Sequence, residues 1–80
     1  MHVTNNDRAA WAQVAIDAYQ DATGTDDESA LGDLLCDLRH WAKRADYDFD
    51  EYSARGLMHF EAEVEEEEDR RVAVDERSEE

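Results

Sequence analysis

Three aspartates at alternate positions could bind a calcium ion. The stretch Asp46-Tyr-Asp48-Phe-Asp50 resembles the opening of an EF-hand loop, in which alternate carboxylates supply oxygen ligands. The rest of the loop pattern is missing, because Glu51 stands where the turn needs glycine and Leu57 stands where a bidentate glutamate closes the site. Aspartates are also common where helices start, so helix capping explains these residues more simply than calcium binding.

Two pairs of potential metal ligands have helical spacing. Cys36 and His40 are four residues apart, as are His59 and Glu63. Two such pairs could together supply four zinc ligands. Pairs at this spacing are frequent in short helical chains, and Cys36 between Leu35 and Leu38 is typical of a small buried apolar residue. We therefore expect no metal and no other cofactor.

Nothing in the sequence predicts catalysis. The chain has no glycine-rich loop and no nucleophile carried by a strand, and three short helices offer little room for a pocket. Carboxylates are abundant, but without a pocket they do not form an acid–base pair. We expect a protein that is not an enzyme.

Acidic residues dominate the charge of the chain. There are 23 Asp and Glu against 8 Lys and Arg, a formal net charge of -15, which repels nucleic acid and anionic membranes. Between Asp46 and Asp69 the only cation is Arg55. The eleven acidic residues of this stretch are the predicted partner-binding site: Asp46, Asp48, Asp50, Glu51, Glu61, Glu63, Glu65, Glu66, Glu67, Glu68 and Asp69.

The density of this charge is similar to that of a nucleic acid duplex. In a helix, the seven carboxylates between Glu61 and Asp69 span about 12 Å. Duplex DNA carries one charge per about 1.7 Å of its axis, so the two densities are close. This favours a basic protein partner that normally handles DNA or RNA. One Lys against seven Arg, with abundant Asp, also fits acidity that serves only solubility or salt tolerance.

The apolar pattern predicts an all-α fold, a small three-helix bundle with an acidic C-terminal extension. We expect helices at about 7–23, 26–45 and 49–68, which together form a domain over 1–68, and a charged tail over 69–80 that can continue the third helix. Asn5 or Asn6 can cap the first helix, and Gly24 is suited to end it. The predicted core consists of large apolar side chains: Trp11, Leu34, Leu35, Leu38, Trp41, Phe49, Tyr52 and Phe60.

Several features predict a cytoplasmic protein. No apolar run reaches the roughly 18 residues of a membrane span, and the N-terminal residues lack the pattern of a secretory signal. Cys36 is the only cysteine, which fits a reducing compartment. With so small a core, a homodimer is compatible with the sequence, for example through the alanine-rich face of the first helix.

The chain also resembles a group of known proteins. The segments carrying the resemblance are Leu31-Gly-Asp-Leu-Leu-Cys-Asp-Leu-Arg-His-Trp41, Asp48-Phe-Asp50 and Met58-His-Phe-Glu-Ala-Glu63. They are similar to small acidic proteins, mostly uncharacterised, that are encoded on bacterial plasmids, integrative elements and prophages. The similarity covers about residues 10–63 and brings no catalytic residue.

The resemblance implies a mobile-element context, in which small acidic inhibitors of the anti-CRISPR and anti-restriction type are common. With the charge pattern, it predicts a DNA mimic that binds a nuclease or a CRISPR effector complex. The alternative is a small regulatory or interaction module with an exposed aromatic patch, whose candidate members are Tyr19, Tyr47 and His59.

Overall fold

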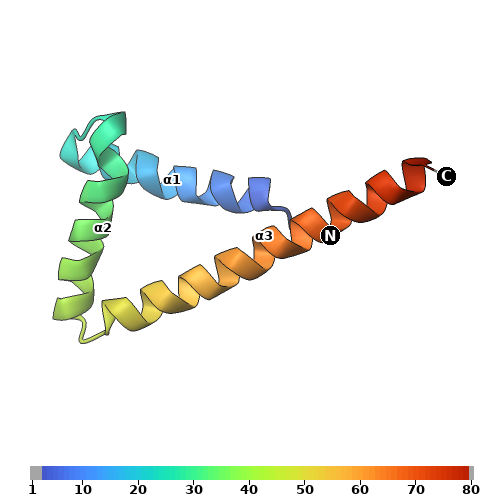
Figure 1. Cartoon of the computed structure of the whole chain (residues 1–80). Helices are drawn as coiled ribbons and strands as arrows, with labels where there is room; N and C mark the ends of the chain where they lie inside the picture. Colours follow the sequence, from blue (N-terminus) through green and yellow to red (C-terminus); the bar gives the residue numbers. More distant parts are fainter. Residues whose placement is uncertain (1–2, 80) are drawn as a thin grey trace. The chain divides into compact units, whose positions relative to one another are not determined.

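The computed structural model describes the backbone of residues 3–79 and the side chains of residues 3–70. The α-helix is the only regular secondary structure in the described residues, which contain no strand. Its three helices are α1 (Asn5–Thr23), α2 (Asp27–Arg44) and α3 (Phe49–Glu79) (Figure 1). The predicted all-α fold class with three helices is confirmed.

Local capping explains where α1 begins and ends. Thr4 is the N-cap: its side-chain oxygen accepts from the backbone N–H of Asp7 at 3.1 Å, and the Asp7 carboxylate accepts from the backbone N–H of Thr4 at 3.0 Å. This reciprocal pair satisfies N–H groups that lack partners within the helix. The cap is therefore Thr4, and not Asn5 or Asn6 as predicted. At the other end Gly24 adopts a left-handed φ of 74°, as its position after the helix favours.

The start of α2 is capped by an aspartate, and its end is a Schellman motif. The Asp26 side chain accepts from the backbone N–H of Ser29 at 2.9 Å. At the C-terminal end the backbone N–H of Tyr47 donates to the carbonyl of Ala42, and that of Asp46 donates to the carbonyl of Lys43. Asp46 takes the left-handed position, φ 64°, that glycine usually occupies. The Tyr47 ring stacks on Trp41, with ring centroids 5.6 Å apart, which supplies the apolar contact common in this motif.

The third helix is the longest element of the chain. It begins at Phe49, as predicted, and its backbone stays helical through the acidic run to Glu79. The backbone of residues 69–79, part of the predicted charged tail, continues α3. The chain divides into two compact units, residues 1–50 and 51–80. A domain boundary at residue 68 stays a prediction.

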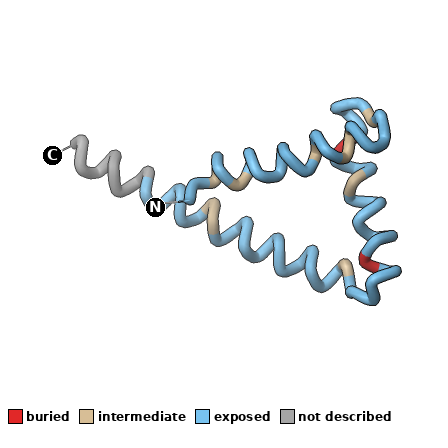
Figure 2. The backbone as a smooth tube through the Cα atoms, turned by 180° about the vertical axis from the view of Figure 1, so that it is seen from behind, coloured by how far each residue is buried: buried red, intermediate tan, exposed pale blue. Residues whose placement is uncertain are grey.

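Small residues provide nearly all of the burial. Among the described side chains only Ala30 and Ala42 are buried, with exposed fractions of 2% and 4% (Figure 2). Both lie on α2. Between the two helices of the first unit, the Tyr19 hydroxyl of α1 donates to the Asp37 carboxylate of α2 at 2.6 Å. Beside the connection itself, the Gln20 side chain of α1 donates to the Asp27 carboxylate of α2 at 2.8 Å.

The predicted core is wrong for this chain. Trp11, Trp41 and Phe60 are each 61% exposed, and Leu34 and Phe49 are half-buried. Leu35, Leu38 and Tyr52 are also exposed. Helical spacing indicates which side chains share a face, but burial requires a second element over that face along its whole length.

Candidate partner-binding surfaces

The acidic residues of the predicted site fall into two groups with different surroundings. Asp46, Asp48 and Asp50 belong to the first compact unit, and the others belong to the second. Every member is exposed except Glu63, which is half-buried. The larger group lies along one continuous helix, α3, so its spacing follows from helical geometry alone.

Most of the N-terminal group has local structural roles. Asp46 ends α2, as described above. The Asp50 carboxylate pairs with the Arg39 guanidinium at 2.9 Å. At the start of the second group, Glu51 pairs with Arg55 one turn later. These contacts offset part of the charge that the sequence had placed at this end of the site. Because the pairs are solvent-exposed, each contributes at most about 1 kcal/mol to stability.

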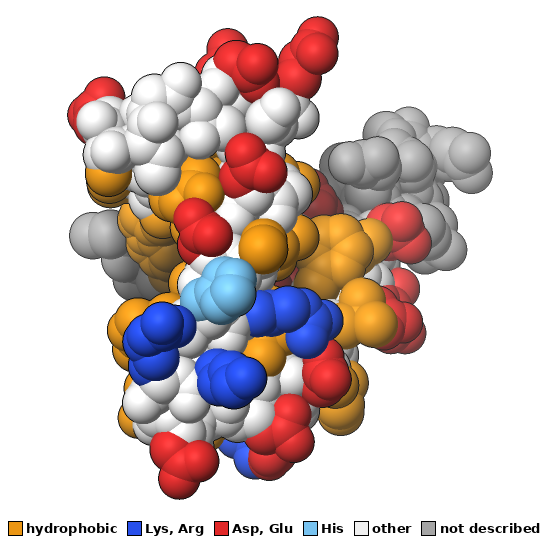
Figure 3. Space-filling view, turned by 90° about the vertical axis from the view of Figure 1, so that its left-hand side faces the viewer, with side chains coloured by type: hydrophobic (Ala, Val, Ile, Leu, Met, Phe, Trp, Pro, Cys, Tyr) orange, Lys and Arg blue, Asp and Glu red, His pale blue; other side chains and the backbone are white. Residues whose placement is uncertain are grey.

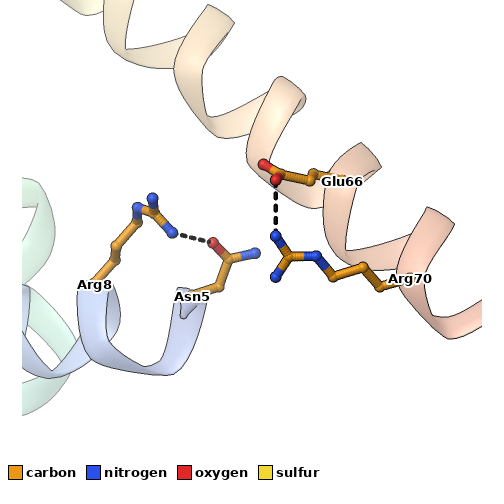
Figure 4. A network of polar contacts seen from close by, with 4 residues as sticks. All are labelled: Asn5, Arg8, Glu66 and Arg70. Atoms are coloured by element: carbon orange, nitrogen blue, oxygen red, sulfur yellow. Dashed lines mark hydrogen bonds and ion pairs between the residues drawn. The ribbon is translucent and has the colours of Figure 1, made fainter. Parts of the chain in front are cut away.

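The acidic run of α3 presents its most regular charge on one side of the helix. Glu61, Glu65 and Glu68 are four and three residues apart, a spacing that aligns them on one face. Glu63 and Arg70 project from the opposite side, and Val64 lies on the same side as Glu61 and Glu68. Glu66 pairs with Arg70 at 2.9 Å one turn along the helix (Figure 4). We call Glu61, Glu65 and Glu68 the acidic face of α3.

A cationic cluster occupies the C-terminal half of α2. Lys43 and Arg44 lie in the last helical turn, where positive charge is favourable beside unpaired backbone carbonyls. Arg39 lies one turn earlier, and its guanidinium carbon is 4.4 Å from the centroid of the Phe49 ring. Figure 3 shows cationic side chains gathered on one surface next to a histidine. This basic end of α2 belongs to the first compact unit, whereas the acidic run of α3 belongs to the second.

The aromatic patch proposed from the sequence has only one member without a described local contact. Tyr19 is half-buried and bonded to Asp37, Tyr47 is 51% exposed and stacked on Trp41, and His59 is exposed on α3. Larger exposed apolar side chains are Trp41 on α2, which stacks on Tyr47, Trp11 on α1 and Met58 on α3. Sequence reasoning had assigned both tryptophans to the core.

The Tyr19–Asp37 contact has no signal in the sequence, because the two residues are 18 positions apart. The hydrogen bond to Asp37 favours the protonated phenol. This hydrogen bond is the main cause that raises the pKa of Tyr19 from 10.0 to about 12. Desolvation of the phenol and the negative charges of Asp37 and Asp33 add smaller contributions in the same direction. This contact ties the two helices of the first unit together.

The described residues contain no metal-binding cluster of three or more His, Cys, Asp or Glu side chains. Cys36 is exposed, so its predicted role as a buried apolar residue is wrong.

On α1, the Arg8 guanidinium donates a hydrogen bond to the Asn5 side chain at 3.0 Å, a contact within one helical turn (Figure 4). No helix in the described part of the chain has the length and apolar character required to cross a bilayer.

Compared with known proteins, the chain matches no family model, no curated protein and no solved structure. The resemblance to small acidic proteins of mobile elements thus stays a prediction from the sequence. Function has to be inferred from the surfaces of the chain itself.

Proposed function

We propose that this chain is a non-enzymatic inhibitor that binds a basic, nucleic-acid-handling protein and competes with DNA or RNA for its groove. The observation that carries the proposal is the acidic run on α3, with seven carboxylates between Glu61 and Asp69 on one continuous helix. At about 1.5 Å rise per residue, the run has nearly the linear charge density of a duplex.

A helix that presents charge at this density can occupy a groove shaped for a phosphate backbone. The acidic face of α3 supplies carboxylates at steps of about 5–6 Å, and the neighbouring Glu66, Glu67 and Asp69 extend the negative field around the helix. Lysine and arginine side chains that bind phosphate can also bind carboxylates. Binding would block nucleic acid without any chemical step.

The overall charge favours rapid association with such a partner. A net charge of -15 on 9.2 kDa steers the chain toward a basic groove, and the attraction weakens as salt screens it. A nuclease or a CRISPR effector complex has a groove of this kind. In the mobile-element context that the resemblance implies, the chain would act as an anti-CRISPR or anti-restriction protein in the cytoplasm.

The proposal is tested by competition for such an effector. A labelled duplex is bound to a purified nuclease or CRISPR effector complex, and the full chain is added while fluorescence anisotropy reports the bound duplex. We expect displacement that weakens steeply as salt rises toward about 1 M, where the Debye length is about 3 Å. The triple variant Glu61→Lys, Glu65→Lys, Glu68→Lys should lose displacement at unchanged helicity.

A matched control separates local charge from total charge. The variant Asp17→Lys, Asp21→Lys, Asp33→Lys changes the net charge by the same amount at exposed positions of α1 and α2. It should displace the duplex nearly as well as the unmodified chain. Equal loss in both triple variants would show that only total charge matters, and no displacement from a panel of effectors would contradict the mimicry.

The exposed apolar side chains favour a second candidate, a protein-interaction module whose acidity serves only solubility or salt tolerance. Trp11, Trp41, Met58 and Phe60 are between 61% and 71% exposed, although large apolar side chains usually lie inside a folded protein. An apolar interface would keep or gain affinity at high salt. The salt series described above therefore distinguishes the two candidates.

A further inference from the structure

The second helix carries an exposed apolar face along most of its length. Leu31, Leu35 and Leu38 recur at helical spacing and are 63%, 46% and 41% exposed. Leu34 lies beside them, half-buried, and Trp41 continues the row. Sequence reasoning assigned most of this face to an internal core, but in the described chain it remains open to solvent.

The charges of α2 make its apolar face complementary to itself. Asp26, Asp27 and Glu28 lie at the N-terminal end, and Lys43 and Arg44 lie in the last turn. If two α2 helices cross antiparallel about Leu34 and Leu35, each acidic end meets the basic end of the other copy. The opposed helix dipoles favour the same orientation, and a parallel pair would place like charges together.

The antiparallel arrangement also defines a register. With Leu34 opposite Leu35 of the second copy, Leu31 lies opposite Leu38 and Glu28 lies opposite Trp41. Glu28 is then within one turn of Arg39 and Lys43 of the second copy, on the same flank of the apolar row. The arrangement is two-fold symmetric, so the same patch serves both copies and the assembly closes at two chains.

We propose that the apolar face formed by Leu31, Leu34, Leu35, Leu38 and Trp41 is the interface of an antiparallel homodimer. A basic protein fits this face less well, because Arg39, Lys43 and Arg44 repel positive charge along its C-terminal half. The face belongs to a different unit from the acidic face of α3, so the dimer is independent of the proposed nucleic-acid mimicry.

The first test is the mass of the full chain in solution. Sedimentation equilibrium at physiological salt should give about twice 9.2 kDa at sufficient chain concentration. In a symmetric dimer, Leu38→Glu places one carboxylate from each copy inside the interface. The dimer dissociation constant should therefore rise by at least about 100-fold. His40→Glu introduces the same side chain on the opposite side of α2 and should leave the dimer intact.

Disulfide trapping tests the orientation and does not depend on the folding of the Leu38→Glu variant. In a Cys36→Ser background, a mixture of Leu31→Cys and Leu38→Cys chains should form a mixed disulfide under mild oxidation. Leu31→Cys chains alone should not, because the register separates the two Leu31 positions by seven residues, about 10 Å along the axis.

Three outcomes would overturn the proposal. A monomer up to millimolar concentration would mean that the face is covered within the chain or by another protein. A dimer that survives Leu38→Glu would use another surface. Trapping of Leu31→Cys chains alone, without the mixed product, would exclude the antiparallel register.

Discussion

The first compact unit of this chain and the acidic part of α3 keep their helices by different means. In the first unit, α1 and α2 are capped by side chains, end in left-handed residues and are joined by the Tyr19–Asp37 bond. Along α3, the ion pairs join residues four apart, Arg55 with Glu51 and Arg70 with Glu66. The first unit depends on specific contacts, and the acidic helix depends more on local propensity and on salt.

The largest expected difference concerns buried volume. Ala30→Leu should lower the free energy of unfolding by about 1–3 kcal/mol, because Ala30 is 2% exposed and has no room for a larger side chain. Ala54→Leu on the exposed surface of α3 is the control and should change stability by less than about 0.5 kcal/mol. Urea denaturation measures both values, and equal effects would contradict the distinction between the two regions.

Two glycines should respond with opposite signs. Gly24→Ala should destabilise the chain by about 1–2 kcal/mol, because its φ of 74° is unfavourable for a residue with a Cβ. Gly56→Ala, in the interior of α3, should stabilise it by about 0.5–1 kcal/mol, because nothing lies within 4 Å of an added Cβ. Thermal unfolding followed by circular dichroism compares them. A loss of stability for Gly56→Ala would reveal a close contact at that position.

Salt should act mainly on α3. Like charges four residues apart, such as Glu61 with Glu65 and Glu63 with Glu67, each cost about 0.2–0.5 kcal/mol at low ionic strength. Raising salt should therefore slow amide hydrogen exchange over residues 61–69 more than within α1. Exchange measured by NMR at low and high salt tests this. An equal response in α1 would indicate a salt requirement of the whole fold.

The smallest expected effect is the pH dependence of the Tyr19–Asp37 contact. Because the folded-state pKa of Tyr19 is raised to about 12 from 10.0, the contact stabilises the fold fully below pH 10. This contribution is lost as pH rises from 10 through about 12. The difference in Tm between the unmodified chain and Tyr19→Phe should shrink over that window.

Absorbance titration of tyrosinate provides the control for this effect. In an Asp37→Ala variant, the pKa of Tyr19 should move back toward 10.0, because the acceptor that holds the phenolic proton is gone. An unchanged titration would show that Asp37 is not the cause of the shift.

The residues near each helix end made much of the secondary structure predictable. Gly24 after α1 follows from the left-handed conformation that glycine favours at a helix end, and the predicted start of the third helix at residue 49 agrees with Phe49. Local interactions also explain why the predicted cap of the first helix, Asn5 or Asn6, is wrong. Thr4, Asn5 and Asn6 are all good caps, and only Thr4 has Asp7 three residues later to complete the reciprocal pair.

Other features required the folded chain. Asp46 was predicted to belong to a binding site, yet it ends α2 in a left-handed backbone conformation that the sequence does not predict for an aspartate. Asp50 was assigned to the same site, yet it pairs with Arg39, 11 positions earlier. Such contacts depend on how a turn brings two helix ends together, which periodicity alone does not specify.

By itself, the sequence determined the helical class, the positions of the helices and the acidic run on α3, because propensity, capping and charge act over a few residues. Only the tertiary structure decided which apolar side chains are covered. Trp11, Leu38 and Trp41 have the spacing of core residues, yet each remains exposed in the described chain. Burial is a property of two surfaces in contact, and one helix specifies only one of them.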